Sequence, residues 1–149
     1  MPQLTHKLLG AAAVLQDEAG RVLLVKHSYG MLNWELPGGG AELHESLVET
    51  ALREVREETG LDVTAERLTG IYYDPTHPLG EFVHFVFVCR RTTPQDPVPA
   101  PPEITACGFW SPEELPRPIS DLTIRRIRDA LAPARSLLPV TVGTRLWLE

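Results

Sequence analysis

The chain has 149 residues, of which 43% are hydrophobic and 23% charged, and its formal net charge is −6. These values are typical of one soluble globular domain, and the negative charge argues against a large surface for nucleic acid or an anionic membrane. The longest early apolar run, residues 8–16, is too short to span a bilayer and follows no basic signal region. We therefore expect a cytoplasmic protein that binds neither nucleic acid nor a membrane.

Cysteine and histidine spacing gives no sign of a crosslink or a zinc site. Cys89 and Cys107 lie far apart and form no C-x-x-C pair, which favours free core thiols in a reducing compartment over a disulfide. The five histidines are scattered, without the spacing of zinc ligands. The sequence therefore predicts neither a structural disulfide nor a zinc centre.

The first part of the chain shows extended patterns and then a helical one. Residues 7–16 and 21–28 flank the turn signal "DEAG" and predict a β-hairpin. Residues 34–40, "WELPGGG", predict a short extended segment that enters a glycine loop. Residues 46–59 predict a helix.

Strand and loop patterns follow. Residues 67–74 predict a strand, and residues 75–80, "PTHPLG", break the pattern. Residues 81–91, "EFVHFVFVCRR", carry aromatic and β-branched side chains on both faces and predict a central strand. Five prolines between residues 94 and 102 predict a stiff surface loop, in preference to a P-x-x-P ligand.

The last part of the chain is mixed. Residues 106–110 predict a strand, residues 111–115 a helical turn, and residues 120–131 a helix with Ser120 or Asp121 as its N-cap. Residues 137–149 are strand-like and unusually apolar for a chain end, and their pattern gives them no place in the fold. There is no internal repeat and no linker, and strands stand on both sides of the first helix. The sequence therefore predicts a single mixed α/β domain over residues 1–149.

The helix at residues 46–59 carries a dense strip of carboxylates. An advance of about 100° per residue gathers its aliphatic side chains on one face that should pack on a sheet: Leu47, Val48, Ala51, Leu52 and Val55. The same advance places Glu54, Glu57 and Glu58 along the border of that face and turns Arg53 outward. Carboxylates at these spacings repel by about 0.2–0.5 kcal/mol per pair, and such a strip suits a hard divalent cation. On helix geometry alone, a metal site and a solvated acidic face are equal alternatives.

The spacing of the glycine, glutamate and arginine residues in and around this helix decides between the two alternatives. Residues 39–61 fit the pattern G-x5-E-x7-R-E-U-x-E-E-x-G-U, where U is apolar, at every fixed position. At average residue frequencies, a chance match at any one start is of order 10⁻¹⁰. The pattern is the Nudix box, and the chain resembles a Nudix (MutT-like) hydrolase. The order of the flanking segments resembles the whole domain of that family, which implies an α/β/α sandwich with a mixed sheet between helices.

The resemblance also implies an activity, which is Mg²⁺- or Mn²⁺-dependent hydrolysis of a nucleoside diphosphate linked to another group. The matching positions imply that Glu54, Glu57 and Glu58 bind the metal together with the backbone carbonyl of Gly38. They also imply that Arg53 holds one of these glutamates in place.

The resemblance also implies supporting roles for two residues and leaves the general base undecided. Glu45 matches the supporting glutamate of the family, and Gly60 matches the glycine that ends the helix. Two glutamates are candidates for the general base that accepts a proton from the attacking water. One is Glu54 in the box, and the other is Glu103, just after the proline loop and seven residues before Trp110.

The substrate is predicted less sharply. "SPEELP" at residues 111–116 and "RRIRDAL" at residues 125–131 resemble family members that act on ADP-ribose, whereas Pro75 and Pro78 lie near, not on, a proline position of that branch. ADP-ribose or a nucleotide sugar therefore leads, a (d)NTP follows, and a dinucleoside polyphosphate comes third. Five aromatic side chains are candidates for stacking on the base: Tyr29, Trp34, Tyr72, Tyr73 and Phe82. A ligand sensor without turnover is the alternative, although the intact box favours catalysis, and a homodimer is left open.

Overall fold

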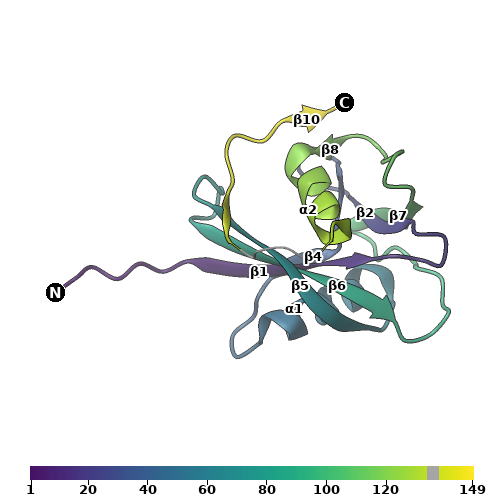
Figure 1. Cartoon of the computed structure of the whole chain (residues 1–149), viewed down its shortest axis with the longest axis horizontal. Coiled ribbons are helices and arrows are strands. Elements are labelled where there is room, and N and C mark those ends of the chain that lie inside the picture. The colour runs from purple at the N-terminus through teal and green to yellow at the C-terminus, as the bar shows by residue number, and fades with distance from the viewer. Residues whose placement is uncertain (134–137) are drawn as a thin grey trace.

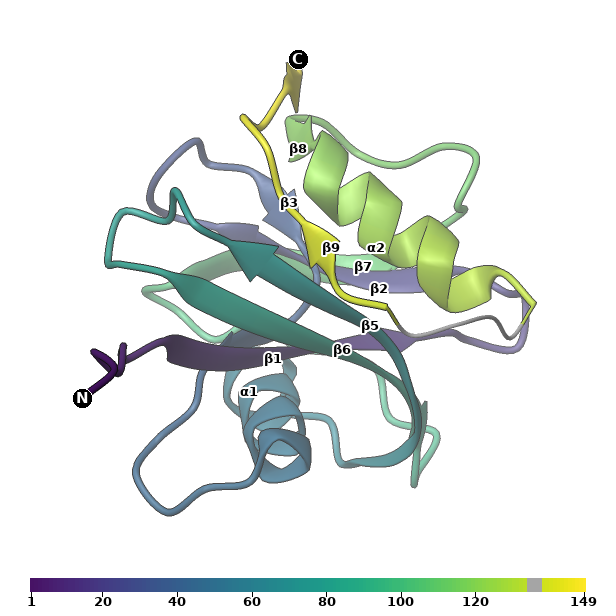
Figure 2. The same cartoon turned by 60° about the vertical axis from the view of Figure 1, so that its left-hand side comes forward.

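The computed structural model describes residues 1–133 and 138–149. They form two five-stranded sheets and two helices (Figure 1, Figure 2). Sheet A has the order β4-β1-β6-β5-β9, with β1 Leu8–Leu15, β4 Gly38–Gly40, β5 Val63–Asp74, β6 Phe82–Arg91 and β9 Val140–Thr141. Sheet B has the order β10-β8-β3-β2-β7, with β2 Val22–His27, β3 Trp34–Glu35, β7 Ile104–Trp110, β8 Ile119–Ser120 and β10 Trp147–Leu148.

The two helices lie on opposite faces of sheet A. Helix α1 (Leu47–Thr59) packs on β1, β4 and β5, and helix α2 (Asp121–Leu131) packs on β5, β6 and β8. Figure 2 shows α1 beneath the sheet and α2 above it. Sheet A is mixed, because β1 pairs with β6 in parallel and with β4 antiparallel. The predicted α/β sandwich, with a mixed sheet between helices, is therefore confirmed.

Strand β1 supplies side chains to the cores on both sides of sheet A. Val14 joins the core beneath α2, and Leu15 joins the core against α1. Strand β6 lies between β1 and β5, and its Val86 is fully buried, which confirms the predicted central strand. Cys89 of β6 and the half-buried Cys107 are free thiols, as their spacing predicts.

The predicted β-hairpin near the N-terminus is wrong beyond its turn. The turn forms, since Asp17 N donates to Arg21 O over 2.9 Å and Gln16 bridges to Val22. Strand β1 belongs to sheet A, however, and β2 leaves the turn into sheet B, where it pairs with β3 and β7. The turn residues determine only the turn, because the sheet that each strand joins depends on its long-range partners.

Helix α1 begins and ends where the sequence predicts. Ser46 Oγ accepts from Glu49 N at 3.1 Å and Glu49 Oε2 accepts from Ser46 N at 3.2 Å, which makes a capping box. Gly60 follows the helix with a φ of 73°, the left-handed conformation that glycine adopts without strain. The packed face differs in part from the prediction, because Val48 is 39% exposed. Val55, which is fully buried, lies nearer the centre of that face.

The C-terminal segment, which the sequence left without a place, joins both sheets. Its described part, residues 138–149, contributes β9 parallel to β5 and β10 antiparallel to β8; Leu137 lies outside the described residues. Arg145 Nη2 lies 2.9 Å from Asp74 Oδ2, and Leu146 N donates to Asp121 Oδ1 at 3.0 Å. The segment therefore fastens β5 to the beginning of α2.

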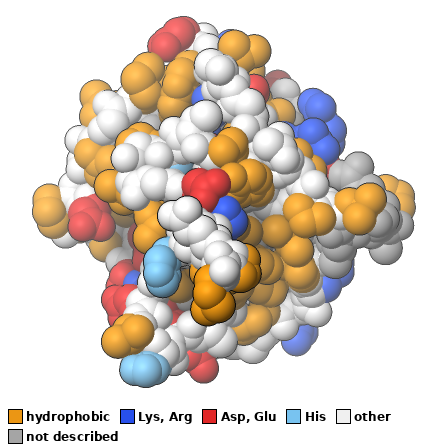
Figure 3. Space-filling view, turned by 90° about the vertical axis from the view of Figure 1, so that its left-hand side faces the viewer, with side chains coloured by type: hydrophobic (Ala, Val, Ile, Leu, Met, Phe, Trp, Pro, Cys, Tyr) orange, Lys and Arg blue, Asp and Glu red, His pale blue; other side chains and the backbone are white. Residues whose placement is uncertain are grey.

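Part of the molecular surface is apolar. Hydrophobic side chains gather at the end from which the N-terminus projects (Figure 3), where Leu4, Leu8 and Leu9 are exposed. The homodimer that the sequence leaves open is not tested by this surface. No helix within the described residues is long and apolar enough to cross a membrane.

Candidate functional site

The glycines of β4 bring its backbone against helix α1 and strand β1. A Cβ added at Gly39 would lie 2.4 Å from Glu54 Oε1, and one added at Gly38 would lie 2.5 Å from Ala11 O. A side chain at Gly38 would collide with the backbone of β1, and one at Gly39 would displace the Glu54 carboxylate, so glycine lets the backbone approach closely at both positions. The peptide groups of this strand therefore lie directly beside the carboxylates of α1.

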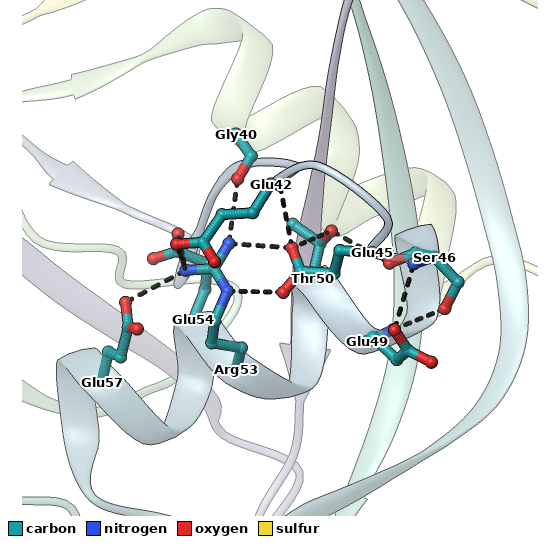
Figure 4. Close-up of polar contacts among 9 residues, drawn as sticks. All are labelled: Gly40, Glu42, Glu45, Ser46, Glu49, Thr50, Arg53, Glu54 and Glu57. Atoms are coloured by element: carbon teal, nitrogen blue, oxygen red, sulfur yellow. Dashed lines mark hydrogen bonds and ion pairs between the residues drawn. The ribbon is translucent and has the colours of Figure 1, made fainter.

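Arg53 is the centre of the polar contacts on this face of α1 (Figure 4). Its guanidinium donates to Glu45 from Nε over 2.7 Å and from Nη2 over 3.0 Å, and Nη2 also donates to Gly40 O over 2.9 Å. Nη1 bonds Glu54 Oε1 at 2.8 Å and Glu57 Oε2 at 3.1 Å. The predicted outward orientation of Arg53 is wrong, since its side chain is only 21% exposed. Charge-assisted bonds to three carboxylates hold the guanidinium over β4 (Gly38–Gly40), which is called the glycine strand below.

Glu45 is the anchor of Arg53. Besides the two bonds from Arg53, its Oε1 accepts from Thr50 Oγ1 at 2.7 Å and from Glu42 N at 3.1 Å. Hydrogen bonds from Arg53 and Thr50 lower the pKa of Glu45 to about 2. Glu45 therefore stays ionised at neutral pH and fixes the guanidinium from the side opposite Glu57, an arrangement that suits a supporting role.

Glu58 is buried against β4, and one of its oxygens lacks a partner. The residue is 7% exposed, and Gly38 N donates to its Oε1 at 3.1 Å. Its Oε2 has no hydrogen-bond partner among the described residues. Burial raises the pKa of Glu58 to about 9, with the charges of Glu54 and Glu35 adding to the rise. A buried carboxyl group that lies near a second acidic side chain, Glu54, and has one oxygen without a hydrogen-bond partner fits a place that a cation completes.

The donor atoms around the glycine strand suit a hard divalent cation. Glu54, Glu57 and Glu58 offer carboxylate oxygens and Gly38 a backbone oxygen, which are ligands that Mg²⁺ and Mn²⁺ prefer. Within residues 1–133 and 138–149, no three carboxylate, imidazole or thiol side chains converge closely enough to enclose a metal ion. Arg53 forms ion pairs with both Glu54 and Glu57. Metal binding by the two glutamates would therefore require at least one of their carboxylates to turn away from Arg53.

The proline-rich loop before Glu103 is fastened to the end of α1. The backbone N–H groups of Val98 and Ala100 donate to the last carbonyls of that helix, over 2.9 and 3.2 Å. Ser28 N donates to Glu103 O at 2.9 Å, which ties Glu103 to the loop after β2. The side chain of Glu103 is exposed. The predicted loop thus brings the backbone of Ala100, three residues before Glu103, to the helix end that carries Glu58.

Glu35 is a further carboxylate of this region, which the sequence analysis did not single out. Its Oε1 accepts from Leu36 N and from Thr123 Oγ1, each at 2.8 Å, and from the guanidinium of Arg126. The available signal was a charged residue inside the segment "WELPGGG". The contact itself was hidden, because Arg126 lies on α2, 91 residues later in the chain.

Comparisons with known proteins point in one direction. The family model for the NUDIX domain matches residues 6–131. A MutT-like protein of Streptomyces ambofaciens is 33% identical over 123 residues, which cover 83% of this chain and 76% of that protein. An ADP-ribose pyrophosphatase of Methanocaldococcus jannaschii is 30% identical over 86 residues, which cover 56% of this chain and 50% of that protein. Three further relatives match over 35–54% of their own length.

A solved structure agrees over nearly the whole chain. The crystal structure of an ADP-ribose pyrophosphatase from Streptococcus suis superposes with a TM-score of 0.71 at 27% sequence identity. The match covers 92% of this chain and 100% of that one. The fold around β4 and α1 is therefore similar to that of an ADP-ribose pyrophosphatase.

Proposed function

The chain belongs to the Nudix hydrolase family, and from that premise we propose that it hydrolyses the phosphoanhydride bond of a nucleoside diphosphate linked to another moiety. Hydrolysis of pyrophosphate bonds is the activity that the family membership carries. The finer proposal is that ADP-ribose or a nucleotide sugar is the substrate, with a (d)NTP as the next candidate. Its support is the similarity of the chain to the ADP-ribose pyrophosphatases of Methanocaldococcus jannaschii and Streptococcus suis.

Family members are typically metal-dependent, and the residues of this chain fit a divalent cation. We propose that Glu54, Glu57, Glu58 and the Gly38 carbonyl hold Mg²⁺ or Mn²⁺. Such an ion, when bound, neutralises phosphate charge and lowers the pKa of a coordinated water. The observation that carries this proposal is the buried Oε2 of Glu58, which has no partner among the described residues.

The groups of the chain itself supply the rest of the reaction. Arg53 holds Glu54 and Glu57, and the glycine strand leaves open backbone beside them. One carboxylate accepts a proton from the attacking water. The water oxygen then bonds to phosphorus and the P–O bond to the bridging oxygen breaks, which gives two phosphorylated products. From ADP-ribose these products are AMP and ribose 5-phosphate.

We propose Glu54 as a metal ligand and Glu103 as the candidate proton acceptor to test first. The Oε1 atom of Glu54 already accepts a bond from Arg53, whereas Glu103 is exposed on a loop that two backbone bonds fasten to α1. A general base must reach the attacking water without being held elsewhere. The exposed side chain of Glu103 has no hydrogen bond or ion pair among the described residues, so it meets that requirement better than that of Glu54.

A panel of nucleoside diphosphate derivatives, assayed with Mg²⁺ and with Mn²⁺, tests the proposed function. Release of AMP from ADP-ribose, and its loss in EDTA, is the expected result. Glu58→Gln should lower turnover at least about a hundredfold, as loss of a charged group at a catalytic site does. Glu66→Gln is the matched control, because Glu66 is exposed on β5 and pairs only with Arg90 among the described residues.

Two outcomes would each overturn one part of the proposal. Binding of ADP-ribose without release of AMP under any metal condition would indicate the alternative, a ligand sensor. Normal turnover in Glu58→Gln would remove that residue from the metal site while leaving the activity standing.

A further inference from the structure

The structure separates the five aromatic side chains that the sequence offers for base stacking. Tyr72 is 1% exposed, and its hydroxyl donates to Asp129 Oδ2 at 2.7 Å. The hydroxyl of Tyr73 donates to Glu81, and Lys7 lies over its ring, 4.9 Å from the centroid. Both tyrosines therefore already have partners within the fold.

Two more of the five belong to packed clusters. Trp34 packs edge-on against Trp110, with ring centroids 5.3 Å apart, at the side of the core beneath α2. Phe82 is 8% exposed and stacks on His84, with centroids 4.3 Å apart. Phe82 therefore has no open face, and the half-buried Trp34 already packs against Trp110 and the core.

Tyr29 differs from the other four. Its side chain is 56% exposed, and His27 covers one ring face, with centroids 4.6 Å apart and planes inclined by 12°. The loop that carries it is tightly tied, because Leu32 N donates to Tyr29 O and His27 N donates to Asn33 O, each over 3.0 Å. The ring is thus held from one side and open on the other.

This ring lies near the carboxylates of the candidate site. Ser28, its chain neighbour, is bonded to the backbone of Glu103, and His27 pairs with Ile104 in sheet B. Partial burial raises the pKa of the Tyr29 phenol, and the negative charges of Glu58, Glu103, Glu35 and Glu54 raise it further. Val98 and Ala100, on the loop that leads to Glu103, bond to the last carbonyls of α1. Backbone contacts therefore connect the Tyr29 loop to the helix end that carries Glu58.

We infer that Tyr29 is the platform on which the nucleobase of the substrate stacks, with His27 supporting the ring from behind. The inference rests on the proposed function, since it supplies the base-binding part of the same site. A diphosphate that the α1 carboxylates would hold through a divalent cation, and a base against Tyr29, would give one ligand two separate points of attachment. A stacked aromatic contact tolerates any base, because every base has a π-face.

The test compares ligands with and without a base. AMP and ribose 5-phosphate are titrated by calorimetry in Mg²⁺ against the wild type, Tyr29→Phe and Tyr29→Leu. In Tyr29→Leu we expect AMP to bind roughly 5- to 150-fold more weakly, the range for loss of one base–aromatic stack. The affinity for ribose 5-phosphate should not change, and Tyr29→Phe should bind AMP within about twofold of the wild type, since the ring and not the hydroxyl makes the stack.

The same variants are then assayed for turnover of ADP-ribose and of a base-free diphosphate of two ribose 5-phosphates. A rise in KM confined to ADP-ribose is expected, with kcat nearly unchanged. Equal losses for both substrates would show that Tyr29 only shapes the loop, and weak AMP binding in Tyr29→Phe would assign the contact to the hydroxyl; either result overturns the inference. If no substrate is hydrolysed, the proposed function fails, while the AMP titration still decides the role of Tyr29.

Discussion

Substitution by alanine at Gly38, Gly39 and Gly40 is expected to have three different effects. A Cβ at Gly38 would meet backbone, at 2.5 Å from Ala11 O and 2.8 Å from Ala12 Cα. A Cβ at Gly39 would meet the tip of a side chain, at 2.4 Å from Glu54 Oε1. A Cβ at Gly40 would have no described atom within 4 Å.

Gly38→Ala should act on folding. The contacts are with the backbone of β1, which is paired to β4 on one side and β6 on the other, so it cannot move without disturbing both. Overpacking of this kind costs about 1–3 kcal/mol of unfolding free energy.

Gly39→Ala should act on catalysis. Glu54 can turn its carboxylate aside at a cost of about 0.5–1.5 kcal/mol for an unfavourable rotamer, so the fold tolerates the new methyl group. The turn breaks the 2.8 Å contact between Arg53 and Glu54 and misplaces the carboxylate. A misplacement of about 1 Å at a reacting group costs about a hundredfold in rate.

Urea denaturation in EDTA and kcat at saturating Mg²⁺ measure the two effects separately. Gly38→Ala should shift the urea midpoint, Gly39→Ala should lose turnover at a nearly native midpoint, and Gly40→Ala should stay within about 0.5 kcal/mol and near the native rate. If Gly38→Ala and Gly39→Ala lose the same stability and the same activity, the distinction between a backbone and a side-chain contact is refuted.

Three further sets of substitutions test separate parts of the molecule. Glu103→Gln should lower kcat by about 10²–10⁴-fold without changing the metal requirement, whereas Glu54→Gln should raise the metal concentration for half-maximal activity; a Glu103→Gln enzyme with the native rate would exclude it as the base. Leu23→Ala, at a fully buried position, should cost about 2–5 kcal/mol in a urea melt, and the half-buried Leu52 should cost less when truncated; the reverse order would mean that the packed face of α1 is misassigned. Burial lowers the pKa of His84 to about 3, so below about pH 6.5 the unfolded chain binds a proton that the native state does not. The free energy of unfolding should therefore fall as the pH drops from about 6.5 towards 3, by at most about 1.4 kcal/mol per pH unit for this group, and His84→Gln should reduce that slope; an unchanged slope would contradict the assignment.

The parts of the fold that the sequence predicts well are those encoded by neighbouring residues. The capping box of α1 and its glycine end follow from Ser46, Glu49 and Gly60, which lie within or next to the helix. The position of Glu58 at the edge of the packed face follows from helical periodicity alone, and its 7% exposure confirms it. The metal, the general base and the homodimer stay predictions.

The parts that the sequence misses depend on contacts across long separations. Strand β2 leaves its hairpin partner because β7, some eighty residues on, pairs with it: Lys26 lies opposite Ala106. Arg53 turns inward over a shorter separation, because Glu45 and Gly40, which precede α1, accept hydrogen bonds from its guanidinium. The contact of Glu35 with Arg126 is again a long-range contact. The periodicity of a helix indicates which of its faces is apolar, but it does not indicate which charged residues of other segments lie against that helix.

The fastening of the proline loop has an evolutionary consequence. Two backbone bonds pin Val98 and Ala100 to the end of α1, and a third pins Glu103 to Ser28, so the few residues between these anchors act as a spacer of fixed length. An inserted or deleted residue after Val98 would shift Glu103 along the chain relative to α1. In relatives that keep the bonds of this loop to α1 and to Ser28, the loop length before Val98 should vary. The number of residues from Val98 to Glu103 should stay constant. Grafts of this loop between family members should succeed only when that spacing is preserved.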